Sequence, residues 1–271
     1  MRVIPPSNVL PKDCVIGDGV EIARDARINV TERLVIGDRT VINSGAIIEG
    51  RRIELGRECW LAENAHIGGG SCFDDWSVFK CGDWLHMGRY SHVNTARSVV
   101  MGDEVGLGRG TCVYTHGVYL SAWEGFPANF DSVVFGSRVW IPQAVVLPGV
   151  RLGDDIVVAA GSVVTKDFPS GCMIRGVPAV RLRDNLFPDM SGNSQSRKRD
   201  IIFAIETDIG IDLKYDPSTE VVVVGDTVFK LKKPRIIEGP ATNATERVKN
   251  QLRRYGIRFR FTVRDGEYVK W

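Results

Sequence analysis

The sequence has no apolar run of the eighteen or more residues that a membrane-spanning helix requires. Its first residues, MRVIPPSNVLPKD, also lack the continuous apolar core of a secretory signal peptide. These two absences predict a protein without a membrane span that works in the cytoplasm.

Cysteine and net charge exclude further classes. The six cysteines show no CxxC spacing, so the chain has neither the pattern of a disulfide framework nor that of a typical zinc-binding module. We expect them to be small buried residues in a reducing compartment. The net charge of +2 argues against a partner recognised mainly by charge, such as nucleic acid.

A six-residue repeat of aliphatic side chains is the strongest pattern in the chain. A helix repeats every 3.6 residues and a strand every two, so neither produces a period of six. The period is typical of a parallel β-helix, in which each hexapeptide is a short strand plus a turn and three hexapeptides complete one coil. The inward positions are expected at Ile16, Ile22, Ile28, Ile36, Ile42, Ile48, Leu55, Leu61, Ile67, Met101, Leu107, Val113, Phe135, Ile141, Leu147, Leu152, Val158 and Val164.

The repeat is interrupted twice. Over 71–100 it blurs among aromatic residues, and we expect distorted coil there, with the aromatics as extra core or as a ligand wall. After Val113 it stops for the segment THGVYLSAWEGFPANFDSVV and resumes at Phe135. A long loop inside a tight repeat is usually functional.

Beyond the repeat the composition changes. We predict a β-helix domain over 1–183, a polar linker over 184–199 and a small α+β module over 200–271. The segments FAIETDIGIDLKYD and EVVVVGDTVFKL are expected to be strands, and IRFRFTVRDGEYVKW a strand pair. NATERVKNQLRRYG is expected to be a helix that Asn243 caps and Gly256 ends.

The role of the module remains open. Its charge is positive, and Arg253 and Arg254 lie near the expected helix end. It either favours an acceptor with a phosphate or carboxylate group or serves as a stabilising cap with solvated charges.

Among the four histidines, His116 has the best position for catalysis. It lies at the start of the long interruption, and imidazole titrates near neutrality, which suits a general base. His66, His86 and His92 each precede an inward aliphatic residue, so their side chains are expected to point away from the core.

The segment GSRVWIPQAVVLPGVRLGDDIVVAAGSVVTKDFPSGCMIRGVPAVRLRD resembles the closing segment of the hexapeptide-repeat acyltransferases. It is most similar to the maltose and galactoside O-acetyltransferases, the xenobiotic acetyltransferases and the polysaccharide O-acetyltransferases. The resemblance implies an all-β, left-handed parallel β-helix that forms a homotrimer and binds acetyl-CoA between subunits. It also implies that His116, in YTHG, is the base that activates the hydroxyl or amine of a small acceptor, such as a sugar or a nucleotide- or lipid-linked sugar.

The same resemblance implies the ligand contacts. Acetyl-CoA would contact Trp140, Gln143, Ala160, Thr165, Lys166, Arg181 and Arg183. Pro142-Gln143 replaces the family's usual Gly-Ala or Gly-Ser after VWI, and Val180 replaces one usual basic residue. Asn94 either orients the acceptor or stacks in a corner of the coil. Tyr119, Trp123 and Glu124 form an acceptor wall or pack against the β-helix.

Other functions fit the same fold. A γ-type carbonic anhydrase would bind zinc through histidines such as His66, His86 and His92, although their spacing differs from that family's pattern. A non-catalytic β-helix scaffold is a second alternative. Nucleic-acid binding by the basic module is a third, which the alternating charges of its strands disfavour.

Overall fold

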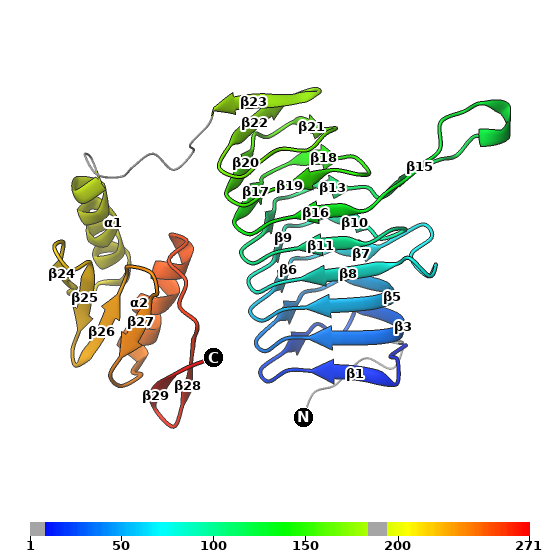
Figure 1. Cartoon of the computed structure of the whole chain (residues 1–271). Coiled ribbons are helices and arrows are strands. Elements are labelled where there is room, and N and C mark those ends of the chain that lie inside the picture. The colour runs from blue at the N-terminus through cyan, green and yellow to red at the C-terminus, as the bar shows by residue number, and fades with distance from the viewer. Residues whose placement is uncertain (1–8, 184–193) are drawn as a thin grey trace. The chain divides into compact units, whose positions relative to one another are not determined.

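The computed structural model describes residues 9–183 and 194–271 (Figure 1). The chain forms two compact units, Met1–Phe187 and Pro188–Trp271. The first unit is the predicted parallel β-helix. Within the described residues, no helix is both long and apolar enough to cross a membrane.

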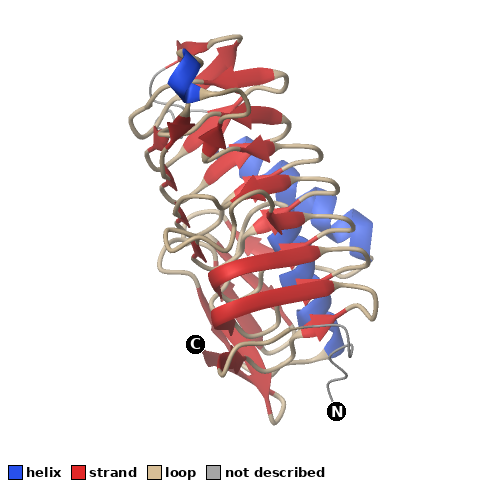
Figure 2. Cartoon of the chain, turned by 90° about the vertical axis from the view of Figure 1, so that its right-hand side faces the viewer, coloured by secondary structure: helices blue, strands red, loops and turns tan. Residues whose placement is uncertain are grey.

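Each coil of the β-helix has three faces, and the strands of successive coils stack in parallel (Figure 2). Face 1 contains β1 (Asp13–Ile16), β8 (Val78–Cys81), β11 (Val99–Met101), β16 (Val133–Phe135) and β19 (Arg151–Leu152). Face 2 contains β2 (Glu21–Ile22), β4 (Val41–Ile42), β6 (Trp60–Leu61), β9 (His86–Met87), β12 (Gly106–Leu107), β17 (Val139–Ile141), β20 (Ile156–Val158), β22 (Met173–Gly176) and β23 (Ala179–Arg183). Face 3 contains β7 (His66–Gly68), β10 (His92–Asn94), β13 (Cys112–Val113), β18 (Ala144–Val146) and β21 (Ser162–Val164).

Two long strands join face 3 to face 1. β3 (Arg27–Ile36) and β5 (Ile47–Leu55) pair with face 3 through their first halves and with face 1 through their second halves. We call the edge where they bend the His116 edge, because that residue follows face 3 there. In Figure 1, β1, β3 and β5 run from right to left in front while the chain climbs, so the coil is left-handed.

Stacked aliphatic side chains form the core. One inward column follows the strand register through Ile28, Ile48, Ile67, Val93, Val113, Val146 and Val164, and all of them are fully buried. Each coil covers the apolar face of the coil below it, which is why single coils cannot be stable. The predicted hexapeptide core is therefore confirmed over most of its length.

The expected inward position of Leu147 is wrong. Val146 is fully buried and pairs with Val113 and Val164, whereas Leu147 is half-buried. The chain needs only five residues from Ile141 to Val146. The corner at Pro142-Gln143 is therefore one residue shorter than a regular hexapeptide turn, and the sequence repeat shifts there by one position.

The blurred segment 71–100 is coil, as expected. Phe79 occupies an inward position on face 1, paired with Ile53 below and Val99 above, and is fully buried. Phe73 and Trp76 lie in the turn before β8 and are exposed. The aromatic residues thus divide between core and surface.

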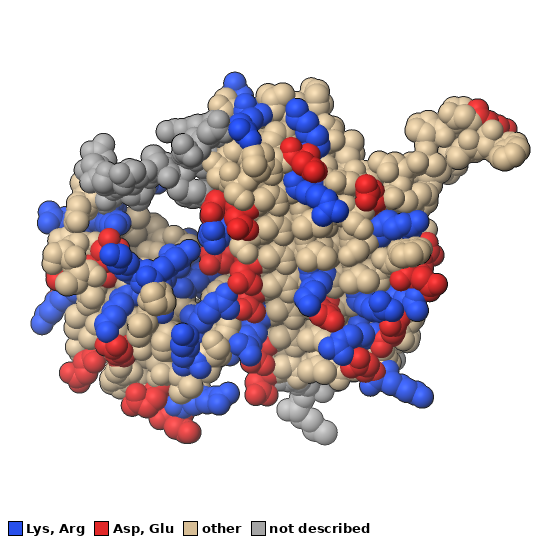
Figure 3. Space-filling model, in the orientation of Figure 1, with Lys and Arg blue, Asp and Glu red and all other residues tan. Residues whose placement is uncertain are grey.

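An arm leaves the His116 edge in place of a turn. It consists of β14 (His116–Gly117), the short 3-10 helix η1 (Ala122–Glu124) and β15 (Asn129–Phe130), and the two strands pair antiparallel. In Figure 1 this arm projects away from the stacked coils. Figure 3 shows it as a mostly uncharged projection, and its only charged residue over 117–130 is Glu124.

The second unit has a core of its own. A four-stranded antiparallel sheet contains β24 (Lys214–Asp216), β25 (Val221–Val224), β26 (Thr227–Lys230) and β27 (Ile236–Glu238). A second strand pair contains β28 (Phe261–Arg264) and β29 (Glu267–Lys270). Together with two helices, α1 (Ser194–Ile209) and α2 (Asn243–Arg254), they bury Phe229, Val248 and Leu252 completely.

Three expectations for this unit need correction. FAIETDI is not a strand but the end of α1, because Ile202, Ile205 and Ile209 lie on one helical face and pack into the core. Residues 194–199 of the expected linker are helical as the first part of α1, and 184–193 lie outside the described residues. Thr242, not Asn243, caps α2, through a reciprocal hydrogen-bond pair with Thr245.

Candidate active site

His116 stands at the base of the arm, directly after a coil of the core ends. Val113 is its last inward residue, and the buried Thr115 leads into β14. The antiparallel register places Phe130 opposite His116, and their rings stack with centroids 5.6 Å apart. The arm therefore holds one face of the imidazole.

Asn94, one coil below, fixes the Nδ1 edge of the His116 imidazole. Its Oδ1 accepts a hydrogen bond from Nδ1 of His116 at 2.8 Å and another from Oγ1 of Thr115 at 2.7 Å. Its Nδ2 donates to the carbonyl oxygen of Gly70 at 3.0 Å. An amide oxygen can only accept, so Nδ1 of His116 carries the proton and Nε2 keeps its lone pair.

Asn94 was expected either to orient the acceptor or to stack in a corner of the coil, and the structure buries it at a corner. It is only 1% exposed, and both polar atoms of its amide are hydrogen-bonded inside the protein. The alternative, a corner asparagine, describes its place. What the sequence did not reveal is that this corner residue holds the histidine.

Gly70 keeps the space beside Nε2 open. A Cβ atom on this residue would lie 3.5 Å from both Cε1 and Nε2 of His116. Any longer side chain would cover the nitrogen that carries the lone pair. The absence of a side chain thus leaves Nε2 accessible.

Phe130 and Arg97 belong to this site but were missed by the sequence analysis. The guanidinium carbon of Arg97 lies 4.7 Å from the ring centroid of Phe130, a cation–π distance. The backbone N–H of Arg97 donates to Oγ1 of Thr115. Only the register of the arm brings Phe130 back to His116, and the length of the interruption was the one signal available.

The other histidines occupy two faces. His66 and His92 are neighbours on face 3, with ring centroids 4.8 Å apart, and Nε2 of His66 lies 3.0 Å from Oε1 of Glu49. His86 lies on face 2. The three therefore do not converge within one chain, and among the described residues no group of three His, Cys, Asp or Glu side chains is arranged to hold a metal.

Burial lowers the pKa of His92 below its ordinary value, and the neighbouring His66 acts in the same direction. We therefore expect His92 to be neutral at pH 7.

Three of the residues expected to contact acetyl-CoA cluster between faces 2 and 3. Trp140 lies on β17 and is 44% exposed, with its ring over Gly106, where a Cβ atom would come within 2.4 Å of the indole. Gln143 and Ala160 are exposed at the corners that follow β17 and β20. The carbonyl oxygen of Gln143 accepts a hydrogen bond from the backbone N–H of Gly161, so the two corners stack.

Thr165 and Lys166 lie at the other end of face 3. Both are exposed and follow β21, so they leave the face along the His116 edge. Arg181 is exposed on β23, and the backbone of Arg183 ends that strand. One chain therefore presents the expected acetyl-CoA contacts along two edges rather than in one pocket.

The expected acceptor wall lies at the end of the arm. Tyr119 and Trp123 are each 98% exposed, so the alternative that they pack against the coils of their own chain is wrong. Glu124 is the last residue of η1 and is also exposed. Within one chain these three residues are not brought to His116.

Part of the chain is similar in sequence to known proteins. No family model matches it. It is 32% identical over 117 residues to galactoside O-acetyltransferase of Escherichia coli, a match that covers 39% of this chain and 57% of the relative. It is 35% identical over 75 residues to 2,3,4,5-tetrahydropyridine-2,6-dicarboxylate N-acetyltransferase of Staphylococcus aureus, covering 28% of this chain and 27% of the relative.

A solved structure, a hexapeptide-repeat acetyltransferase from Vibrio cholerae, is 26% identical with a TM-score of 0.40 and covers 48% of this chain and 73% of that chain. The matches to the curated relatives thus span little more than half of those proteins at most. Both curated relatives are named as acetyltransferases.

Proposed function

We propose that the protein is an acetyltransferase that moves the acetyl group of acetyl-CoA to a hydroxyl or amine of a sugar acceptor. The observation that carries the proposal is the His116–Asn94 pair. A histidine whose Nδ1–H is held by a buried amide, and whose Nε2 faces an opening, has the arrangement of a general base. The partial matches to acetyltransferases support the same chemistry.

In the proposed reaction, Nε2 of His116 accepts the proton of the acceptor hydroxyl or amine as that atom attacks the thioester carbonyl carbon. The bond from carbon to the new oxygen or nitrogen forms, and the carbon–sulfur bond breaks. The proton then passes from Nε2 to the departing sulfur. The hydrogen bond from Nδ1–H to Asn94 stabilises the positive charge that the ring carries between these two transfers.

Trp140 and Lys166 are surface residues whose chemistry suits the extended shape of acetyl-CoA. Trp140 offers an aromatic plane that the missing side chain of Gly106 allows to lie flat on face 2. The ammonium group of Lys166 is exposed and suits a phosphate. When bound, acetyl-CoA supplies the acyl group, and these residues would hold its arm and its phosphates.

We further propose a homotrimer in which each acetyl-CoA lies between two subunits. The expected contacts occupy two edges of one chain, so a second copy would bring one set opposite the other. The exposed tip of the arm, with Tyr119 and Trp123, is suited to pack on that neighbour. Closed rings are the usual result of such head-to-tail contacts.

A thiol-release assay tests the proposed activity. The chain is incubated with acetyl-CoA and a panel of sugars, nucleotide-linked sugars and amines, and free CoA is measured. His116→Ala should lower turnover by about a hundredfold or more, the scale expected for loss of a general base. CoA binding, measured by calorimetry, should survive, and near-normal turnover in this variant would refute the mechanism.

A further inference from the structure

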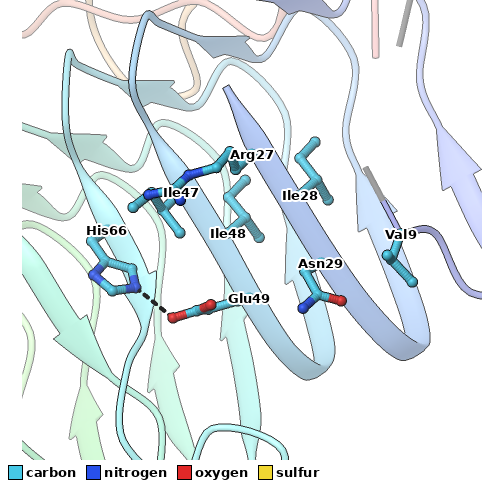
Figure 4. A pocket seen from close by; sticks show the side chains of 8 residues that line it. All are labelled: Val9, Arg27, Ile28, Asn29, Ile47, Ile48, Glu49 and His66. Atoms are coloured by element: carbon cyan, nitrogen blue, oxygen red, sulfur yellow. Dashed lines mark hydrogen bonds and ion pairs between the residues drawn. The ribbon is translucent and has the colours of Figure 1, made fainter. Parts of the chain in front are cut away.

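A cleft opens on face 3 below the candidate active site (Figure 4). It has a volume of about 470 Å³ and is lined by Val9, Arg27, Ile28, Asn29, Ile47, Ile48, Glu49 and His66. Neither the proposed chemistry nor the proposed acetyl-CoA contacts use any of these residues. The cleft therefore needs an explanation of its own.

The strand register connects the cleft to His116. The outward residues Arg27, Ile47, His66, His92 and Cys112 are successive partners on face 3. A second column runs through Asn29, Glu49, Gly68 and Asn94. Both columns follow the axis of the β-helix; the first passes through the coil that carries His116, and the second reaches Asn94 in the coil below it.

The surface between the cleft and His116 is polar, and part of it is bare backbone without side chains. His66 bonds to Glu49 and stacks on His92, while Gly68, Gly69 and Gly70 lie between Glu49 and His116 and carry no side chains. A Cβ on Gly69 would lie 3.0 Å from Nε2 of His92, and one on Gly70 would touch His116. The three glycines thus leave a continuous strip for a ligand.

The chemistry of the cleft suits carbohydrate. Arg27, Asn29, Glu49 and His66 offer both donors and acceptors to hydroxyl groups, and Val9 and Ile47 offer aliphatic surface to the carbon face of a ring. Arg27 is exposed on β3, so its guanidinium can donate hydrogen bonds to a ligand on this face. A metal or a flat apolar cofactor would find neither its ligand set nor its apolar walls here.

The length of the strip sets the size of the ligand. Glu49 lies three coil-to-coil steps below the coil of His116, and Asn29 lies four steps below it. With strands about 4.8 Å apart, these separations are about 14 and 19 Å. A single sugar unit cannot reach from His116 to Asn29.

We propose that this cleft is a second acceptor subsite, and that the acceptor is an oligosaccharide of several units lying along face 3. The unit that receives the acetyl group is at His116, and a remote unit is held by Arg27, Asn29 and the Glu49–His66 pair. The inference rests on the proposed function and names its acceptor class. It also makes monosaccharides poor substrates, because they lose the remote contacts.

A glycan array tests the subsite without any acetyl transfer. The full-length protein, without acetyl-CoA, is applied to printed series of glucose, N-acetylglucosamine and uronic acid oligomers of one to six units. Binding should appear or strengthen at least tenfold from three units upward in one series, and His116→Ala should keep it. Asn29→Ala and Arg27→Ala should each weaken the binding of longer oligomers about tenfold.

Arg24→Ala is the matched control, since Arg24 is an exposed arginine of the same coil outside the cleft. It should bind like the unchanged protein. Absence of binding to every series, equal binding of one-unit and six-unit glycans, or unchanged binding by both cleft variants would overturn the subsite. Thiol release with acetyl-CoA and the same oligomers, compared between the unchanged protein and His116→Ala, tests the proposed function separately, so failure of one proposal is distinguishable from failure of the other.

Discussion

At the scale of single residues, His116 and Asn94 work as one unit. The buried amide of Asn94 has Thr115, Gly70 and His116 as partners, so it cannot rotate without losing several hydrogen bonds. The proton on Nδ1 and the lone pair on Nε2 therefore follow from a buried residue in the coil below. Asn94 is a positioning residue in the proposed reaction.

Replacing Asn94 should change catalysis without removing the base. Asn94→Ala frees the imidazole to rotate and to exchange tautomers, and we expect kcat to fall roughly tenfold to hundredfold, less than for loss of His116. Asn94→Asp places a carboxylate on Nδ1–H, which favours the charged imidazole. The acid limb of its kcat/KM profile should therefore move to higher pH, as measured by thiol release across pH 5 to 9. An unmoved limb in the Asp variant would contradict the positioning role.

His92 should make stability depend on pH. Its folded pKa lies below its unfolded value of about 6.5. Between those two values the unfolded chain binds more protons, so the free energy of unfolding falls as the pH decreases through this window. Urea unfolding at pH 8 and pH 5.5 should show a smaller loss of stability for His92→Gln than for the unchanged protein. An identical loss in both would mean that His92 does not contribute.

At the scale of the elements, the five-residue step into β18 moves the inward position from Leu147 to Val146. Val146 keeps its place in the fully buried column between Val113 and Val164. The shift also sets the corner of Gln143, which stacks on Gly161 in the next coil. A short corner thus positions residues expected to meet acetyl-CoA.

Two neighbouring substitutions check this register. Val146→Ala should lower the free energy of unfolding by about 2 kcal/mol, because it leaves a cavity in the core. Leu147→Ala, although it removes more atoms, should cost about 1 kcal/mol or less because the side chain is half-buried. Chemical denaturation of both variants measures the difference. A larger loss of stability for Leu147→Ala than for Val146→Ala would indicate that Leu147 is the inward residue, as the regular six-residue repeat predicts.

At the scale of the whole molecule, the exposed arm points to assembly. We expect light scattering to give three times the 30.0 kDa mass of one chain. Tyr119→Ser with Trp123→Ser should shift this assembly toward monomers, since both side chains would lose their buried place on a neighbour. Phe203→Ser, an exposed aromatic of α1, is the control and should leave the mass unchanged. An active monomer would refute the shared site.

The second unit should be separable from the first. β23 pairs antiparallel with β22 and extends the face-2 sheet beyond the last coil, while the second unit has a core of its own. A chain ending at Arg183 should therefore keep its cooperative thermal unfolding and its CoA binding. If it stays assembled but loses the acceptor, the second unit binds substrate; if it falls to monomers, the unit is a cap. Loss of the fold on truncation would contradict the expected independence.

The sequence by itself determined the β-helix, its inward columns except at Val146, and the interruption that marks His116. Those features follow from a period of six, which is local and survives without tertiary information. It could not determine that Phe130 returns to the imidazole, because the hairpin register is set by pairing rather than by composition. It misassigned α1 for a similar reason, since an isoleucine-rich segment suits a strand until its packing partners select the helical face.

The tertiary structure alone decided the surroundings of the histidine. Asn94, Gly70 and His116 are far apart in the chain and meet only because successive coils stack in register. The same stacking creates the strip from His116 down to Asn29, whose residues look unremarkable in sequence. A repeat specifies what points inward, whereas the outward columns acquire their chemistry only when the coils are aligned.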